Sequence, residues 1–338
     1  MGLSGIPGPI WKSRTQKPLL YPILKILARA SFWIYCRKLV MNEPALLRIN
    51  GPVLLAANHP NSFLDSVILD TLFSKPVWSL ARGDAFKKPL YSRLMRAMKI
   101  MPVYRTSEGV ENLSSNYQTF NDCIALFRND AIICIFSEGK CINEWHLRPL
   151  KKGTARLAIK AWEEGIPLQV IPVGINFSSF SQFGKNIFLQ FGQIIRSTDI
   201  NLQQPDGLRH AAFNTLLEKE LQQLVFEIPK DDLKLQQEKL AFPLSLLKKW
   251  LLFIPACIGT LLHAPLFLPV RSFVNKKTKD TDHYDSVMVA ILMLLFPLYL
   301  ILLTIVIGVW AGWWALLVLI ISPITARAFV MLNRQTGN

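Results

Sequence analysis

A histidine and an aspartate six positions apart form the residue pair in this sequence that is best suited to proton transfer. His59 follows an apolar run, Val53–Ala57, that predicts a strand, and Asp65 falls in the first turn of a helix expected to begin at about Ser62. Helical side chains lean toward the N-terminus, so the Asp65 carboxylate should lie near the His59 imidazole. A carboxylate there fixes the imidazole tautomer and leaves the other ring nitrogen free as a base. Taken alone, the same spacing also allows two plain capping residues.

Three further blocks place polar residues at the ends of predicted strands. A strand at 100–104 leads to Arg105, and a strand at 131–136 leads to Glu138 and Gly139. A third strand, at 168–175, has prolines near its start and near its end. One block of this kind is weak evidence of function, but four in a fixed order are specific.

Together the four blocks, over about residues 45–195, resemble the glycerophosphate acyltransferase superfamily, which includes the bacterial 1-acylglycerol-3-phosphate acyltransferases. The family's blocks are Asn-His-x4-Asp, a strand ending in Arg, Phe-Pro-Glu-Gly and a Pro-rich strand. Here the first block is His-x5-Asp with Asn61 two residues after the His, which resembles the subset that contains fungal-type glycerol-3-phosphate acyltransferases. Ser137 replaces the usual Pro of the third block, and Lys140-Cys141 stands where Thr-Arg is common.

The resemblance implies acyl transfer from a thioester to a hydroxyl, without a protein nucleophile. His59 is then the general base, and Asp65 orients it. Arg105 is implied to hold the phosphate of the acceptor, because a guanidinium binds two oxygens at once. Glu138 is implied either to bind glycerol hydroxyls or to brace the turn at Gly139.

The missing Arg of the third block leaves open which cation takes its place. The nearby candidates are Lys140, Arg148, Lys151 and Lys152. The segment 147–153 also resembles the family's basic turn before a helix. We therefore expect Gly139, Lys140, Arg148 and Lys151 to join Arg105 and Glu138 in binding substrate.

The elements that must position these residues follow an α/β pattern, which predicts a mixed sheet flanked by helices over residues 44–228. Strands are expected at 45–49, 53–57, 77–80, 100–104, 131–136, 168–175 and 187–191. Helices are expected at 62–73, 90–98, 110–128, 153–164 and 208–226. A charged helical linker, at 229–250, follows this acyltransferase domain.

The rest of the chain is apolar enough to meet a membrane. Residues 286–326 contain no charged residue or histidine. This run is long enough for two membrane spans, so it predicts a helical hairpin at about 286–330. Gly and Trp residues place its tip at 308–314. Residues 251–270 are interrupted by three prolines, which favours a broken, interfacial segment within an anchoring region at 251–338.

The N-terminal region, residues 1–43, is predicted to contain an amphipathic helix at 19–39 that lies on the membrane. An ordinary surface helix packed on the globular domain is the alternative. Eight Lys or Arg residues fall within the first 50 positions, beside one acid. Lysines before the hairpin and arginines after it place both flanks on the cytoplasmic side.

Composition narrows the function classes. The 338 residues carry a net charge of +15 and are 51% hydrophobic. A basic excess beside apolar segments favours an anionic membrane surface and an anionic substrate over nucleic acid. The expected partners are a phospholipid membrane, a thioester donor (acyl-CoA or acyl-carrier protein) and a phosphate-bearing glycerol acceptor, with no other cofactor.

Neither a metal site nor a disulfide framework is expected, because the five cysteines show no CxxC spacing. The predicted location is the cytoplasmic face of the inner membrane in a bacterium, or the endoplasmic reticulum in a eukaryote. Glycerol-3-phosphate or 1-acylglycerol-3-phosphate is the favoured acceptor. Dihydroxyacetone phosphate, another lysophospholipid and a non-catalytic membrane scaffold stay open as alternatives.

Overall fold

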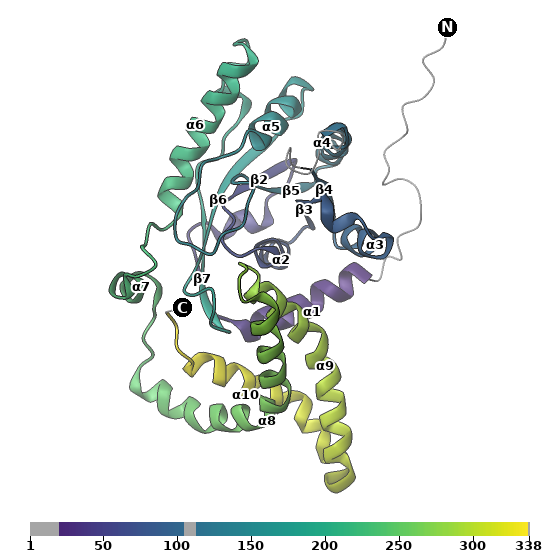
Figure 1. Cartoon of the computed structure of the whole chain (residues 1–338), viewed down its shortest axis with the longest axis vertical. Helices are drawn as coiled ribbons and strands as arrows, with labels where there is room; N and C mark the ends of the chain where they lie inside the picture. Colours follow the sequence, from purple (N-terminus) through teal and green to yellow (C-terminus); the bar gives the residue numbers. More distant parts are fainter. Residues whose placement is uncertain (1–19, 105–112, 337–338) are drawn as a thin grey trace.

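A mixed sheet covered by helices on both faces forms the upper part of the molecule in Figure 1, and three apolar helices project below it. The computed structural model describes residues 20–104 and 113–336. In these residues the strands are β1 (Cys36–Met41), β2 (Val53–Ala57), β3 (Val77–Arg82), β4 (Ile100–Val103), β5 (Ile132–Phe136), β6 (Gln169–Phe177) and β7 (Lys185–Phe191).

The helices of the domain are α1 (Leu20–Tyr35), α2 (Phe63–Leu72), α3 (Pro89–Ala97), α4 (Leu113–Phe127), α5 (Gly153–Glu163), α6 (Asp206–Leu224) and α7 (Leu233–Leu240). Helices α4, α5 and α6 cover one face of the sheet, while α1 and α2 cover the other. The long C-terminal helices are α8 (Leu246–Thr278), α9 (Tyr284–Ala311) and α10 (Val318–Leu332).

The sheet has the strand order β1-β7-β6-β2-β5-β3-β4. The five strands from β6 to β4 run parallel, whereas β7 is antiparallel to β6 and pairs in parallel with β1. All residues of β2 are buried, as expected for a central parallel strand with helices on both faces. The carboxyl ends of β2 and β5 therefore meet at one edge, where α/β sheets bind their ligands.

Two predictions near the N-terminus are wrong. Residues 45–49 form no strand but a short 3-10 helix (Pro44–Arg48), because Pro44 fixes a helical φ at its first position. The helix predicted over 19–39 ends at Tyr35, and the next residues form the edge strand β1. The sheet therefore begins at Cys36, before the domain boundary that is predicted at 43/44.

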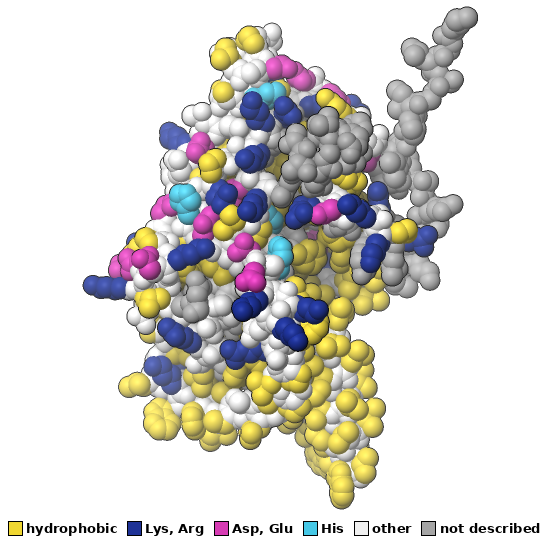
Figure 2. Space-filling view, in the orientation of Figure 1, with side chains coloured by type: hydrophobic (Ala, Val, Ile, Leu, Met, Phe, Trp, Pro, Cys, Tyr) yellow, Lys and Arg dark blue, Asp and Glu magenta, His cyan; other side chains and the backbone are white. Residues whose placement is uncertain are grey.

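The C-terminal region contains two helices, α9 and α10, where the hairpin is predicted. Helix α9 ends at Gly312, which has a φ of +57°, and a short 3-10 helix (Gly312–Leu317) leads into α10. The second arm continues past Arg327, and α10 packs mainly against α8. Figure 2 shows that hydrophobic side chains dominate this end of the molecule, whereas charged side chains gather over the sheet domain.

The expected break at 251–270 does not occur. Helix α8 is continuous through Pro255, Pro265 and Pro269, and Figure 1 shows that its path bends. Each proline removes a backbone donor and clashes with the preceding turn, so the helix curves at these positions instead of ending. Two helical stretches, Leu246–Thr278 and Tyr284–Leu332, are long and apolar enough to cross a membrane.

Candidate active site

The catalytic loop, residues 58–62, connects the end of β2 to the start of α2 and carries His59. The imidazole Nδ1 lies 2.9 Å from Oδ2 of Asp65, in the first turn of α2, so the predicted pair is formed. Asp65 is fully buried, and its Oδ2 also accepts the backbone N–H of Asn61 at 2.8 Å. Burial raises the pKa of Asp65, while the hydrogen bond from His59 lowers it.

The His59 ring is held by a stacking contact on one face as well as by the hydrogen bond at Nδ1. Phe136, the last residue of β5, stacks on the imidazole with centroids 3.9 Å apart and planes within 10°. Among the described residues Nε2 has no hydrogen-bond partner, and His59 lines a large cleft. This arrangement leaves Nε2 as the atom that can remove a proton from a molecule bound there.

Glu138 holds the backbone of the catalytic loop. One carboxylate oxygen accepts the His59 N–H at 2.9 Å, and the other accepts the Arg148 N–H at 3.0 Å. The side chain is 4% exposed and does not line the cleft. Burial raises its pKa, and the two backbone hydrogen bonds lower it. These two contacts tie the catalytic loop to the backbone at Arg148, while the binding of glycerol hydroxyls and the bracing of the Gly139 turn stay predictions.

The cleft beside His59 has a volume of about 1900 Å³ and a partly basic wall. Lys140, Lys151 and Lys152 line it, together with Gly139 and the first residues of α5. No ion pair involves these three lysines within the described part of the chain. A helix N-terminus adds partial positive charge, so this wall suits an anionic group.

One of the cations predicted to bind substrate does not line this cleft, and a second lies outside the described residues. Arg148 points its guanidinium at Glu144, 3.3 Å away, and does not line the cleft. Arg105 lies outside the described residues. Arg156 of α5 does line the cleft but was not predicted, because its position within a helix carries no motif signal.

Residues near the start of α9, which the sequence does not predict to be functional, also lie at the cleft and contact the catalytic loop. Asp282 and His283, just before α9, line the cleft. His283 Nδ1 lies 2.8 Å from the Ser62 hydroxyl, and Ser62 donates its N–H to Sγ of Cys141 at 2.9 Å. His283 is more than 200 positions from His59, so no short sequence motif links the two residues. Only the fold brings them close together.

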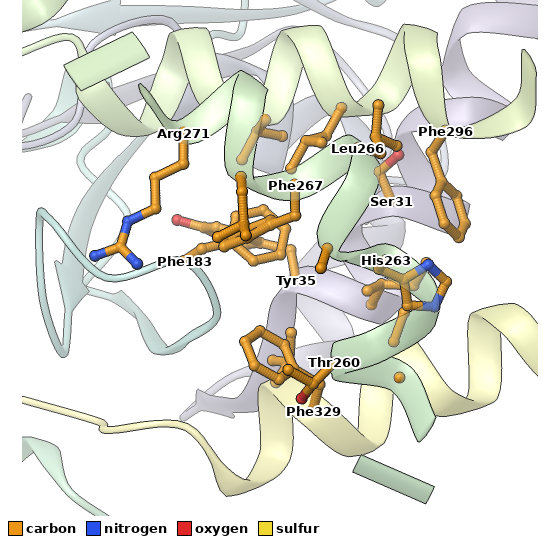
Figure 3. A pocket seen from close by; sticks show the side chains of 18 of the residues that line it. Ser31, Tyr35, Phe183, Thr260, His263, Leu266, Phe267, Arg271, Phe296 and Phe329 are labelled. Carbon is orange, nitrogen blue, oxygen red and sulfur yellow. The ribbon is translucent and has the colours of Figure 1, made fainter. Parts of the chain in front are cut away.

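A second cavity, of about 310 Å³, lies among α1, α8, α9 and α10 (Figure 3). Its lining is mainly apolar and includes Phe183, Phe267 and Phe329, while Arg271 and His263 supply polar groups. It shares no lining residue with the cleft beside His59. His59 therefore opens onto the cleft and not onto this cavity.

The chain is similar to known proteins in two comparisons. A solved structure, the 1-acyl-sn-glycerophosphate (LPA) acyltransferase PlsC from Thermotoga maritima, aligns at a TM-score of 0.43 with 16% identity, over 60% of this chain and 79% of its own. A search of curated protein sequences gave no match. The acyltransferase family model matches residues 32–176, which contain both His59 and Asp65. Over these residues, the α/β domain of this chain therefore resembles the acyltransferase family.

Proposed function

We propose that the protein transfers a fatty acyl group from an acyl thioester to a hydroxyl of glycerol-3-phosphate or 1-acylglycerol-3-phosphate, at a membrane surface, in phospholipid synthesis. The observation that carries this proposal is the His59–Asp65 pair, whose Nε2 opens onto a cleft with a basic wall. The family match supplies the class of reaction, and the lysines supply the reason for an anionic acceptor.

In the proposed reaction, His59 Nε2 accepts the proton of the acceptor hydroxyl while the hydroxyl oxygen attacks the thioester carbonyl. The tetrahedral intermediate then collapses, the C–S bond breaks, and the proton passes to the leaving thiolate. Asp65 keeps the proton on Nδ1 and stabilises the imidazolium that forms during the attack. The acceptor is itself the nucleophile, so no acyl-enzyme is required.

The phosphate of the acceptor is proposed to bind at the basic wall. Lys151 packs its side chain against Gly139 and donates its backbone N–H to the Ser137 carbonyl at 2.7 Å. Gly139 has a φ of +68°, and a Cβ there would lie 3.0 Å from Cγ of Lys151, so the turn brings the lysine close to the backbone. Lys151 and Lys140 therefore take the place of the family's third-block Arg in this proposal.

A membrane location follows from the two long apolar helices and the charge around them. Leu246–Thr278 and Tyr284–Leu332 have few buried residues, so their apolar side chains face outward. Lys276, Lys277 and Lys279 lie beside the sheet-proximal end of α8. A basic residue near an anionic leaflet contributes roughly 1 kcal/mol, so these lysines favour a cytoplasmic orientation for the catalytic domain.

The proposed function is tested by incubating the purified protein in detergent with labelled acyl-CoA or acyl-carrier protein and each acceptor in turn. We expect acyl transfer to one phosphate-bearing acceptor, and a loss of about 10²–10⁴-fold in kcat for His59→Ala, as is typical when a general base is removed. Lys234→Ala, an exposed change on α7, is the control.

The identity of the product lipid shows which acceptor the protein uses. Transfer only to dihydroxyacetone phosphate or to a lysophospholipid with a large head group would reassign the acceptor. Product formation at an unchanged rate by His59→Ala would refute the mechanism. No transfer by the wild-type protein with any of these donors and acceptors would favour a non-catalytic role in the membrane.

A further inference from the structure

The segment that joins the two long apolar helices contacts the catalytic loop directly. This bridging segment, residues 280–286, contains the turn after α8 and the first turn of α9. Figure 1 shows the turn reaching up from the C-terminal helices to α2 and the sheet. It lies outside residues 32–176, the part of the chain that matches the acyltransferase family.

Two residues of α9 bind the catalytic loop through buried hydrogen bonds. Asn61 donates its side-chain amide to Oδ2 of Asp285 at 2.8 Å. The Ser286 hydroxyl donates to the Asn61 carbonyl at 3.0 Å and accepts the Leu64 N–H at 3.0 Å. Asp285 and Asn61 are both at most 1% exposed, so no water competes for these bonds.

Asn61 connects this contact to the catalytic pair. Its backbone N–H donates to the Asp65 oxygen that also binds His59. A chain of contacts therefore runs from Asp285 through Asn61 to Asp65 and then to His59. Displacement of Asn61 would move a hydrogen-bond donor away from the carboxylate that fixes the His59 tautomer.

Asp285 is held in turn by a buried ion pair with Lys185 of β7, and Lys185 also donates to the Ser179 carbonyl. Lys185 is fully buried. Burial lowers the pKa of Lys185, and the nearby charge of Asp285 raises it. A buried pair of this kind is weak evidence for added stability, whereas fixing one arrangement of the surrounding groups is a recognised use of such pairs.

We propose that Asp285 is a positioning residue for the His59–Asp65 pair, so that acyl transfer requires the bridging segment to be docked on the catalytic loop. The inference rests on the proposed function for its activity readout. It makes the C-terminal helices part of the active site and gives them a role besides holding the protein on a membrane. Helices that separate from the loop would leave His59 in place but poorly oriented.

The test compares two double variants that both remove the buried ion pair. Lys185→Met with Asp285→Leu removes the acceptor for Asn61, and apolar replacement of a buried pair is often tolerated by the fold. Lys185→Met with Asp285→Asn keeps an amide oxygen that can accept from Asn61. We expect the first to lower kcat by about 10- to 100-fold with little change in KM for the thioester, and the second to restore kcat to within about threefold of wild type.

The control lies on the same helix. Tyr299→Phe removes the hydrogen bond from the Tyr299 hydroxyl to the Leu262 carbonyl, which joins α9 to α8 away from the loop. It should leave kcat unchanged. Asn61→Ala provides a second test if the leucine variant does not fold. It removes the hydrogen bond from the Asn61 side-chain amide to Asp285 but keeps the Asn61 backbone N–H. It should lower kcat to a similar extent.

An NMR readout separates this inference from the proposed function. The Nδ1–H signal of His59, assigned by its loss in His59→Ala, reports the bond to Asp65 without any substrate. We expect the leucine double variant to shift or lose this signal and the asparagine double variant to retain it. A folded leucine variant with wild-type kcat and an unchanged signal overturns the inference, whereas a wild-type protein without acyl transfer overturns only the proposed function.

Discussion

Two buried carboxylates fix His59, and each acts on a different part of the residue. Asp65 holds the ring through Nδ1, while Glu138 holds the backbone through the His59 N–H. Sequence predicts the first contact, because a helix start places Asp65 close to its partner. It leaves the second undecided, because a Glu at the end of one strand and a His at the end of another meet only through the pairing of β2 with β5.

The burial of Glu138 predicts a pH dependence of stability. Its pKa is raised in the folded state, so between the unfolded value of about 4.3 and the raised folded value the folded protein binds more protons. The contribution of this group to stability is therefore fully present below the unfolded pKa and is lost as pH rises through the folded pKa. Each unit of elevation corresponds to about 1.4 kcal/mol.

Thermal unfolding in detergent at several pH values from 4 upward measures this effect. As pH rises through that window, Tm of the wild type should fall relative to Tm of Glu138→Gln, which does not titrate. The exposed Glu238→Gln, on α7, should follow the wild type at every pH. Parallel curves for wild type and Glu138→Gln would contradict the prediction.

At the scale of elements, the sequence predicts the central strands, because their apolar runs are buried on both faces of the sheet, and it also predicts most helices of the domain. Strand β1 escapes prediction because Arg37 and Lys38 interrupt its apolar pattern and its partner β7 lies far along the chain. The continuity of α8 is not predicted for a different reason. Prolines weaken a helix locally, but packing against α10 keeps it continuous.

The packing of α8 on α10 depends on Gly259. A Cβ at Gly259 would lie 2.3 Å from the Thr325 carbonyl oxygen, a contact that forces the helices apart. A Cβ at Gly308 of α9 would meet Ala315 at an ordinary 3.7 Å. Both glycines lie in apolar helices, so alanine gains the same helix propensity at either position.

We therefore expect Gly259→Ala to destabilise the protein by about 1–3 kcal/mol, the usual cost of overpacking. Gly308→Ala should be neutral or slightly stabilising. Thermal unfolding of the two variants in the same detergent provides the comparison. Equal Tm values for both would show that α8 and α10 do not pack this closely.

At the scale of the whole molecule, charge and apolar surface are separated along one axis. Figure 2 shows blue and magenta side chains over the sheet domain and yellow ones over the projecting helices. Among the described residues, charged and apolar side chains therefore gather on different parts of the surface. Composition alone indicates both properties but cannot place them relative to the cleft.

This separation predicts how the protein leaves a membrane. Because apolar helices and not charge alone should hold it, neither 1 M salt nor alkaline carbonate should release it from vesicles, whereas detergent should. Sedimentation of washed vesicles followed by detection of the protein measures the partition. Release by carbonate would show that the helices pack elsewhere and do not enter the bilayer.

The segment after α10 ties the C-terminal helices back to the sheet domain. Arg37 of β1 donates to the Asn333 carbonyl, and Gln335 accepts from Asn186 of β7 and from the Phe242 N–H, each at 2.8 Å. During translation, these residues leave the ribosome only after all three apolar helices have been made. The β1–β7 edge of the sheet can gain these contacts only after that point, so we expect membrane insertion of the apolar helices to begin before this edge is complete.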